Sequence, residues 1–144
     1  MTGRDFWFHH GGVSVPDLEA AIGWWRDVLG FELEQRLEIQ AIPAKIAFVR
    51  NGPLRIELFE VPGAVPASPD RREPNLDLRT HGNKHVAFAV ADLDAVVAEL
   101  ERRGADIVFV MKHDFGANAF IRDNAGNLIE FLTAPREAGP VAQF

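Results

Sequence analysis

The chain contains an internal repeat, and this repeat constrains the fold more than any other feature of the sequence. Residues 10–21, HGGVSVPDLEAA, match residues 85–96, HVAFAVADLDAV, with identical residues at five of twelve positions. A second match follows in the same order, between LRIEL at 54–58 and NLIEF at 127–131. The spacing between matching positions changes only from 75 to 73 residues across half of the chain. Two copies of one supersecondary unit therefore account for most of the 144 residues.

Each copy is predicted to run as a strand, a helix and three further strands. Asp17 is placed to cap the start of a helix that ends at Gly30, and Asp92 and Gly104 take the same places in the second copy. Between these limits, apolar residues recur at the spacing of an amphipathic helix. The predicted strands are residues 8–15, 31–39, 45–50 and 53–60 in the first copy, and 84–90, 106–111, 117–122 and 127–133 in the second.

This pattern predicts a single α+β domain over residues 1–144, built of two paired βαβββ modules at about 6–60 and 83–133. A module of this size does not bury the helix-facing side of its sheet alone, so the two modules are expected to pair. Residues 61–82 carry four prolines and no periodicity, which is typical of a linker. The DNAG stretch at 123–126 predicts a hairpin turn.

Composition excludes several classes of function. The chain has no cysteine, which excludes a disulfide scaffold, an iron–sulfur protein and a thiol nucleophile. The net charge is −6, and no cluster of lysine and arginine indicates a nucleic-acid-binding surface. No apolar run approaches the roughly 18–20 residues of a membrane span, and the first residues lack the apolar core of a signal peptide. We therefore expect a cytoplasmic protein that binds neither nucleic acid nor membrane.

Strand alternation places four potential metal ligands on one face of the predicted sheets. Each copy contributes a histidine from its first strand and a glutamate from its last, namely His10 and Glu57, and then His85 and Glu130. Two imidazoles and two carboxylates are a suitable ligand set for a divalent metal ion. The neighbouring residues on this face are small and leave room for a substrate: they are Gly12, Ser14, Ala87 and Ala89.

Three further residues are candidates for substrate binding. Arg55 and Arg122 carry charges that suit an anionic group, although ion pairs within the protein would also account for both of them. His113 lies in a predicted loop, where it is a candidate contact to substrate. His9 alternates with His10 along the chain, so we expect its side chain in the core or in an interface.

Several segments of the chain resemble the vicinal oxygen chelate superfamily, which includes glyoxalases, bleomycin-resistance proteins and extradiol dioxygenases. They are HGGVSVPDLEAAIGWWRDVLGF, NKHVAFAVADLDAVVAEL, IELFE and DNAGNLIEF, and the resemblance covers about residues 6–133. It implies that the two modules form a U-shaped sheet around a metal ion bound by His10, Glu57, His85 and Glu130. Nickel, cobalt, zinc, manganese and iron are all compatible with this set, because mixed nitrogen and oxygen ligands do not select sharply among them.

The resemblance leaves three classes of function open. The first is a metal-dependent lyase, isomerase or epimerase of the glyoxalase I or methylmalonyl-CoA epimerase type, which transfers a proton at a carbon next to a carbonyl bound by the metal. The second is an extradiol ring-cleaving dioxygenase with non-haem iron, but such enzymes use two histidines and one carboxylate, and here Glu57 is a fourth ligand. The third is a non-catalytic protein that binds an antibiotic or another small molecule, and the complete ligand set argues against it.

Glu130, alone or together with Glu57, is expected to be the catalytic base. The chain has no cysteine or tyrosine for this role, and Glu130 follows the DNAG turn, where some backbone freedom is expected. The competing hypothesis is that both glutamates are only ligands and that His113 or a metal-bound hydroxide takes the proton. The resemblance also implies a homodimer that acts on a small carbonyl or oxygen-chelating substrate. The apolar surface expected for that interface comes from Trp7, Trp24 and Trp25.

Overall fold

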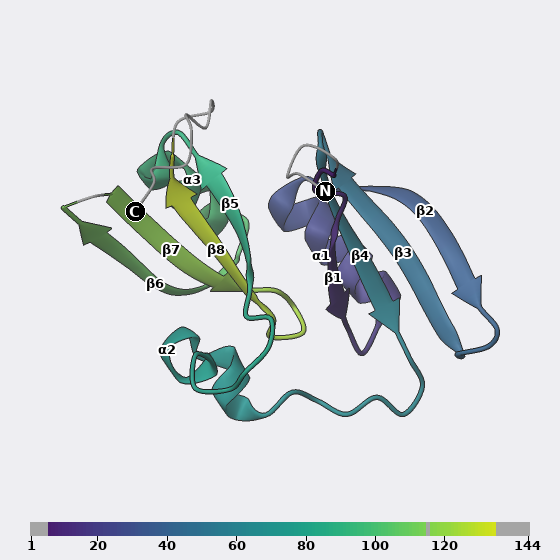
Figure 1. Ribbon diagram of the computed structural model, residues 1–144. Coiled ribbons are helices and arrows are strands. Elements are labelled where there is room, and N and C mark those ends of the chain that lie inside the picture. The colour runs from purple at the N-terminus through teal and green to yellow at the C-terminus, as the bar shows by residue number, and fades with distance from the viewer. Residues whose placement is uncertain (1–5, 115, 135–144) are drawn as a thin grey trace. The chain divides into compact units, whose positions relative to one another are not determined.

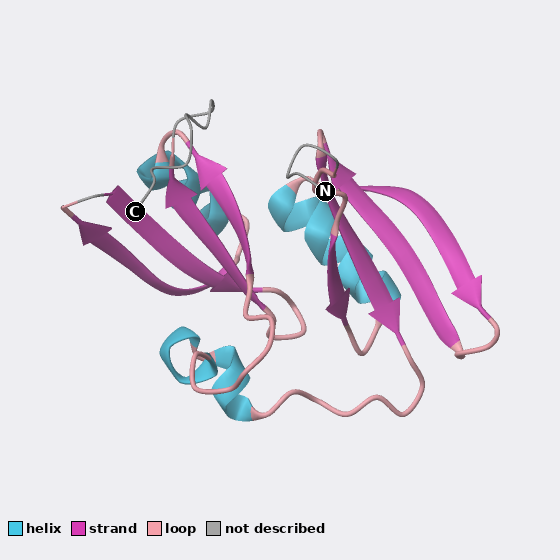
Figure 2. Ribbon diagram, in the orientation of Figure 1, coloured by secondary structure: helices cyan, strands magenta, loops and turns pink. Residues whose placement is uncertain are grey.

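The computed structural model describes residues 6–114 and 116–134 of the chain (Figure 1). The chain divides into two compact units, Met1–Pro66 and Ala67–Phe144. Each unit contains one four-stranded sheet with one longer helix packed on one of its faces (Figure 2). The predicted α+β class and the two βαβββ modules are therefore confirmed.

Unit 1 holds the first copy of the repeat. Its sheet has the strand order β1-β4-β3-β2, in which β1 runs parallel to β4 and the other neighbours are antiparallel. The elements are β1 (Gly11–Ser14), α1 (Leu18–Leu29), β2 (Glu32–Ile39), β3 (Ala44–Asn51) and β4 (Leu54–Glu60). The first strand is shorter than predicted, and His10 lies directly before it.

Unit 2 repeats this topology with the strand order β5-β8-β7-β6, and β5 again runs parallel to β8. Its elements are β5 (Val86–Val90), α3 (Leu93–Arg102), β6 (Asp106–His113), β7 (Gly116–Arg122) and β8 (Leu128–Thr133). The chain turns between β7 and β8 at the DNAG stretch, where the Asp123 carboxylate accepts hydrogen bonds from the backbone N–H groups of Ala125 and Asn127. The predicted hairpin turn is thus present.

Both longer helices begin as the sequence predicts. The Asp17 carboxylate accepts a 2.9 Å hydrogen bond from the backbone N–H of Ala20, and the Asp92 carboxylate accepts a 3.0 Å bond from that of Ala95. Each bond satisfies one of the backbone donors that a helix start leaves without a partner. Gly30, which follows α1, has a φ of 71°, a left-handed conformation that ends the helix at little steric cost.

The cores lie between each helix and its sheet. Trp25 of α1 is 0% exposed and meets the ring of Phe31 edge to face at 5.1 Å. Trp25 therefore belongs to the core of unit 1, as its place on the apolar stripe of the predicted helix indicates, and the expectation that it offers interface surface is wrong. Trp7, by contrast, is 83% exposed. The largest fully buried side chains around these cores are Trp25, Ile46, Ile56, Leu58, Ile121 and Ile129.

The segment 61–82, predicted as a linker, contains short helical turns. These are η1 (Pro69–Arg72) and α2 (Pro74–Asp77), and the chain from Ala67 onward belongs to unit 2. The Asp77 carboxylate is buried beneath Arg71 Nε at 3.0 Å and Lys84 Nζ at 3.1 Å, so two cations compensate its charge. These ion pairs join charged residues six and seven positions apart in the sequence. A search for apolar periodicity does not detect contacts between charged residues.

Among the described residues, no helix is long and apolar enough to cross a membrane.

Candidate metal and catalytic site

Two histidine–glutamate pairs have the same geometry in the two units. His10 Nε2 lies 2.9 Å from Glu57 Oε2 in unit 1, and His85 Nε2 lies 2.9 Å from Glu130 Oε2 in unit 2. Each histidine directly precedes the first strand of its unit, and each glutamate lies on the last strand. The structure therefore brings together the two members of each predicted pair.

The register of the parallel strands explains this geometry. Gly12 lies opposite Glu57 on β4, and Ala87 lies opposite Glu130 on β8. Side chains two residues apart on a strand point to the same side of the sheet, so the histidine two positions earlier reaches the carboxylate. The residues between them in the register, Gly12 and Ala87, carry at most a methyl group.

A phenylalanine supports each imidazole. The ring of His10 meets Phe48 edge to face at 5.2 Å, and the ring of His85 meets Phe120 in the same way at 4.9 Å. Phe48 lies opposite Glu57 in the sheet, and Phe120 lies opposite Glu130. These rings are part of the repeat, and they restrict the orientations of the imidazoles while both pairs remain partly exposed to solvent.

The donor set fits a divalent metal ion. An imidazole nitrogen and a carboxylate oxygen at 2.9 Å share a proton, and a cation takes the place of such a proton when metal binds. Nitrogen and oxygen ligands of this kind suit zinc, nickel, cobalt, manganese and iron. Within the described part of the chain, neither unit alone holds three or more histidine, aspartate or glutamate side chains grouped to bind a metal. Each unit holds one such histidine–glutamate pair.

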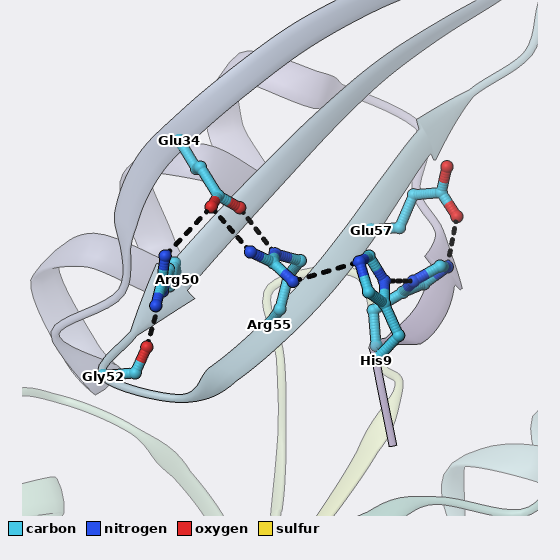
Figure 3. Close-up of polar contacts among 7 residues, drawn as sticks. His9, Glu34, Arg50, Gly52, Arg55 and Glu57 are labelled. Atoms are coloured by element: carbon cyan, nitrogen blue, oxygen red, sulfur yellow. Dashed lines mark hydrogen bonds and ion pairs between the residues drawn. The ribbon is translucent and has the colours of Figure 1, made fainter. Parts of the chain in front are cut away.

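In unit 1, a chain of polar contacts extends from His10 through His9 to Arg55 (Figure 3). Arg55 Nη1 is 3.2 Å from His9 Nε2, and His9 Nδ1 is 2.6 Å from His10 Nδ1. Because a guanidinium only donates, His9 accepts at Nε2 and carries its proton on Nδ1, which donates to His10. The side chain of His9 is exposed and contacts His10, so the expectation that it lies in the core is wrong, while its place in an interface stays a prediction.

Arg55 is held by an ion pair at the far end of this chain of contacts. Its guanidinium donates to both oxygens of Glu34, at 2.6 Å and 2.8 Å, and Arg50 donates to the same carboxylate at 3.3 Å. The hydrogen bond from Arg55 is the main reason that the pKa of Glu34 falls from 4.5 to about 2. Arg55 thus has a partner within the protein, and its predicted contact with substrate stays a prediction.

In unit 2, the polar contacts are made to the carboxylate of Glu130 instead. Asn118 Nδ2 donates to Glu130 Oε1 at 3.1 Å, and Asn118 Oδ1 lies 3.1 Å from His113 Nε2. His113 is the last residue of β6, so its predicted position in a loop is wrong. Asn118 was missed in the sequence, although it lies two residues before Phe120 and therefore on the same face of β7 as the site.

Arg122 has several partners within unit 2. Its guanidinium donates to Glu73 at 2.6 Å, to Asp106 at 3.2 Å and to the backbone carbonyl of Arg72 at 2.8 Å. These contacts fasten the turns of segment 69–77 to β7. The predicted contact of Arg122 with substrate stays a prediction, as it does for His113.

Comparisons with known proteins agree with this architecture. The family model of the Glyoxalase/Bleomycin resistance protein/Dioxygenase superfamily matches residues 7–131. Among solved structures, the glyoxalase family protein from Enterococcus faecalis superposes with a TM-score of 0.74 at 20% identity, covering 88% of this chain and 96% of that one.

Two curated relatives are epimerases by name. The 2-epi-5-epi-valiolone epimerase of an Actinomyces species is 34% identical over 119 residues, which is 69% of this chain and 62% of that protein. The mitochondrial methylmalonyl-CoA epimerase of Mus musculus is 28% identical over 95 residues, which is 66% of this chain and 52% of that protein. The chain therefore spans less than two thirds of the length of either relative.

The ion pair of Glu34 gives a testable pH dependence. Because its pKa is lowered in the folded protein, the pair with Arg55 is complete above pH 4.5 and is lost as the pH falls through about 2. In Arg55→Gln we expect the Glu34 carboxyl to titrate nearer its ordinary pKa, as followed by carbon-13 NMR. Arg50→Gln is the matched control and should move it less. Equal shifts of the Glu34 pKa in the two variants would contradict the conclusion that Arg55 is the main cause of its low pKa.

Proposed function

The chain belongs to the Glyoxalase/Bleomycin resistance protein/Dioxygenase superfamily, and we propose that it is a metal-dependent isomerase, epimerase or lyase that moves a proton at a carbon next to a carbonyl. The observation that carries this proposal is the pair of His–Glu contacts, repeated at 2.9 Å in both units. The epimerases among its relatives support the same class of reaction.

We propose that His10, Glu57, His85 and Glu130 bind one divalent ion together. The equivalence of the two pairs supports this, because each unit supplies half of a ligand set of two nitrogens and two oxygens. The two halves would combine either within one chain or between two chains that exchange units. When bound, the ion would polarise the carbonyl of the substrate and stabilise the negative charge that develops on its oxygen.

The carboxylates would carry out the proton transfer. We propose that Glu130 accepts the proton from the carbon next to the carbonyl. Either Glu130 would then return this proton to the neighbouring carbon, or a second acid, Glu57 or a water molecule, would supply a proton to the opposite face of the same carbon while Glu130 releases its own proton to solvent. Delivery to the opposite face at the same carbon is an epimerisation, and return to the neighbouring carbon is an isomerisation. Glu130 is partly exposed, as a group that meets substrate must be. Glu57 occupies the equivalent place and would share this role or act only as a ligand.

The substrate we propose is a small molecule with a carbonyl and a second oxygen close to it, since two neighbouring oxygens suit a metal with free coordination positions. Three compounds cover the chemistry of the family and of the named relatives. They are 2-epi-5-epi-valiolone, methylmalonyl-CoA and the hemithioacetal of methylglyoxal and glutathione. Exchange of the substrate proton in D₂O reports on the proposed step even where net turnover is slow.

Metal binding should depend on both units. We expect purified protein to hold a divalent transition metal, and His10→Ala and His85→Ala each to lose most of it, because each removes one ligand of a shared site. Elemental analysis measures the content, and His81→Ala, which replaces a histidine outside both pairs, is the control. Equal metal content in the wild type and in both pair variants would end the four-ligand proposal.

The base is tested by replacing one carboxylate at a time. Glu130→Gln should lower both turnover and deuterium exchange by 10²-fold or more, since an amide oxygen can still contact a metal but cannot accept the proton. Glu57→Gln is the matched variant in the other unit and should lose less. Near-native exchange in Glu130→Gln with its metal retained would show that Glu130 is not the base. Cleavage of a catechol by the iron-loaded protein would instead favour a dioxygenase.

We further propose that the protein is a homodimer. The exposed aromatic residues before β1 support this, because Trp7 is 83% exposed and Phe6 and Phe8 flank it with 64% and 71% of their surfaces exposed. Analytical ultracentrifugation at micromolar concentration should give twice the 16.0 kDa mass of one chain. We expect Trp7→Ser to shift the protein towards monomer, and a wild-type species of one chain mass would refute the proposal.

A further inference from the structure

The two units carry different residues at the position two residues before the phenylalanine that faces each glutamate. In unit 2, Asn118 lies two residues before Phe120, the ring that faces Glu130 across the sheet. In unit 1, Ile46 lies two residues before Phe48, the ring that faces Glu57. Ile46 is 1% exposed and has no polar side-chain atom, so unit 1 has an aliphatic residue at the position where unit 2 has the hydrogen-bonding Asn118.

The orientation of the Asn118 amide is fixed by its two partners. A carboxylate only accepts, so the NH₂ group faces Glu130 Oε1, where the structure gives a 3.1 Å hydrogen bond. The amide oxygen is then left to accept from His113 Nε2, also at 3.1 Å. His113 therefore carries a proton on Nε2 and prevents the amide from turning over.

Glu130 consequently has a defined partner at each oxygen. Oε2 contacts His85 at 2.9 Å, while Oε1 accepts from Asn118. In unit 1 the supporting contact is made to the other member of the pair, because His9 contacts His10. One unit thus supports its carboxylate, and the other supports its imidazole.

We infer that Asn118 is a positioning residue for Glu130 and that it assigns the proton transfer to this carboxylate, with Glu57 as a ligand only. This inference rests on the proposed function. A glutamate that accepts a proton through one oxygen must keep its orientation while that oxygen changes partner. The Asn118 hydrogen bond holds the second oxygen throughout this exchange, and misplacement by about 1 Å can cost a reaction as much as 10²-fold.

The contact is tested first in metal-free protein by NMR of side-chain amides. Glu130→Ala should shift the Asn118 side-chain amide resonances, because it removes their acceptor. Glu57→Ala, the matched change in unit 1, should leave them in place. This measurement needs neither substrate nor metal. Unshifted resonances in Glu130→Ala would overturn the inference.

The role is tested with Asn118→Leu and Asn118→Asp, which remove the amide donor with little change in size. We expect each to lower kcat on whichever of the three compounds is turned over by about 10- to 100-fold, with KM changed less than threefold. Zinc affinity, measured by calorimetry, should fall by up to about tenfold in Asn118→Leu. Asn51→Leu, which replaces an exposed asparagine of unit 1, is the control and should retain wild-type values.

The results separate this inference from the proposed function. If Glu130→Gln loses turnover while Asn118→Leu keeps wild-type kcat and zinc affinity, Asn118 has no positioning role and the proposed base stands. If Glu130→Gln keeps its turnover, the proposed base and this inference both fail. Loss of kcat in both Asn118 variants, with KM preserved and the expected amide shifts, supports the inference.

Discussion

The parallel pairing of the first and last strands in each unit is the constraint on which the candidate site depends. It places Gly12 opposite Glu57 and Ala87 opposite Glu130, and the histidine two positions earlier then meets the carboxylate at 2.9 Å. A shift of the register by one residue would turn the histidine to the helix-covered face. The helix of each unit packs on one face of its sheet, and the His–Glu pair lies on the other face. The burial of apolar side chains under the helix therefore determines which face is left for the pair.

Both copies of the repeat hold the same histidine–glutamate pair, but different residues surround the pair in each unit. Both units retain the histidine, the glutamate and the phenylalanine that meets the imidazole. Around this shared arrangement, unit 1 connects its imidazole through His9 to the Arg55–Glu34 ion pair. Unit 2 instead connects its carboxylate to Asn118. The two His–Glu pairs thus share one geometry but differ in their surroundings, and we propose that this difference lets Glu130 act as the base while Glu57 stays a ligand.

The sequence predicted the features that local patterns control. The helix caps at Asp17 and Asp92, the βαβββ order and the DNAG turn follow from spacing within short segments, and the structure confirms them. The members of each His–Glu pair could be selected because the repeat presented the same two residue types twice. Contacts at positions where the two copies of the repeat differ were not predicted. The extension of β6 to His113 and its contact with Asn118 follow from the register of β6 with β7.

The central claim is that the two pairs bind one ion together. It is tested most directly by a crystal structure of the protein loaded with zinc, with the metal located by its anomalous scattering. We predict one zinc ion for each pair of units, ligated by the side chains of His10, Glu57, His85 and Glu130, with zinc–nitrogen and zinc–oxygen distances of about 2.0–2.2 Å. Separate zinc ions at the two pairs, or an ion bound by one pair without the other, would contradict the claim.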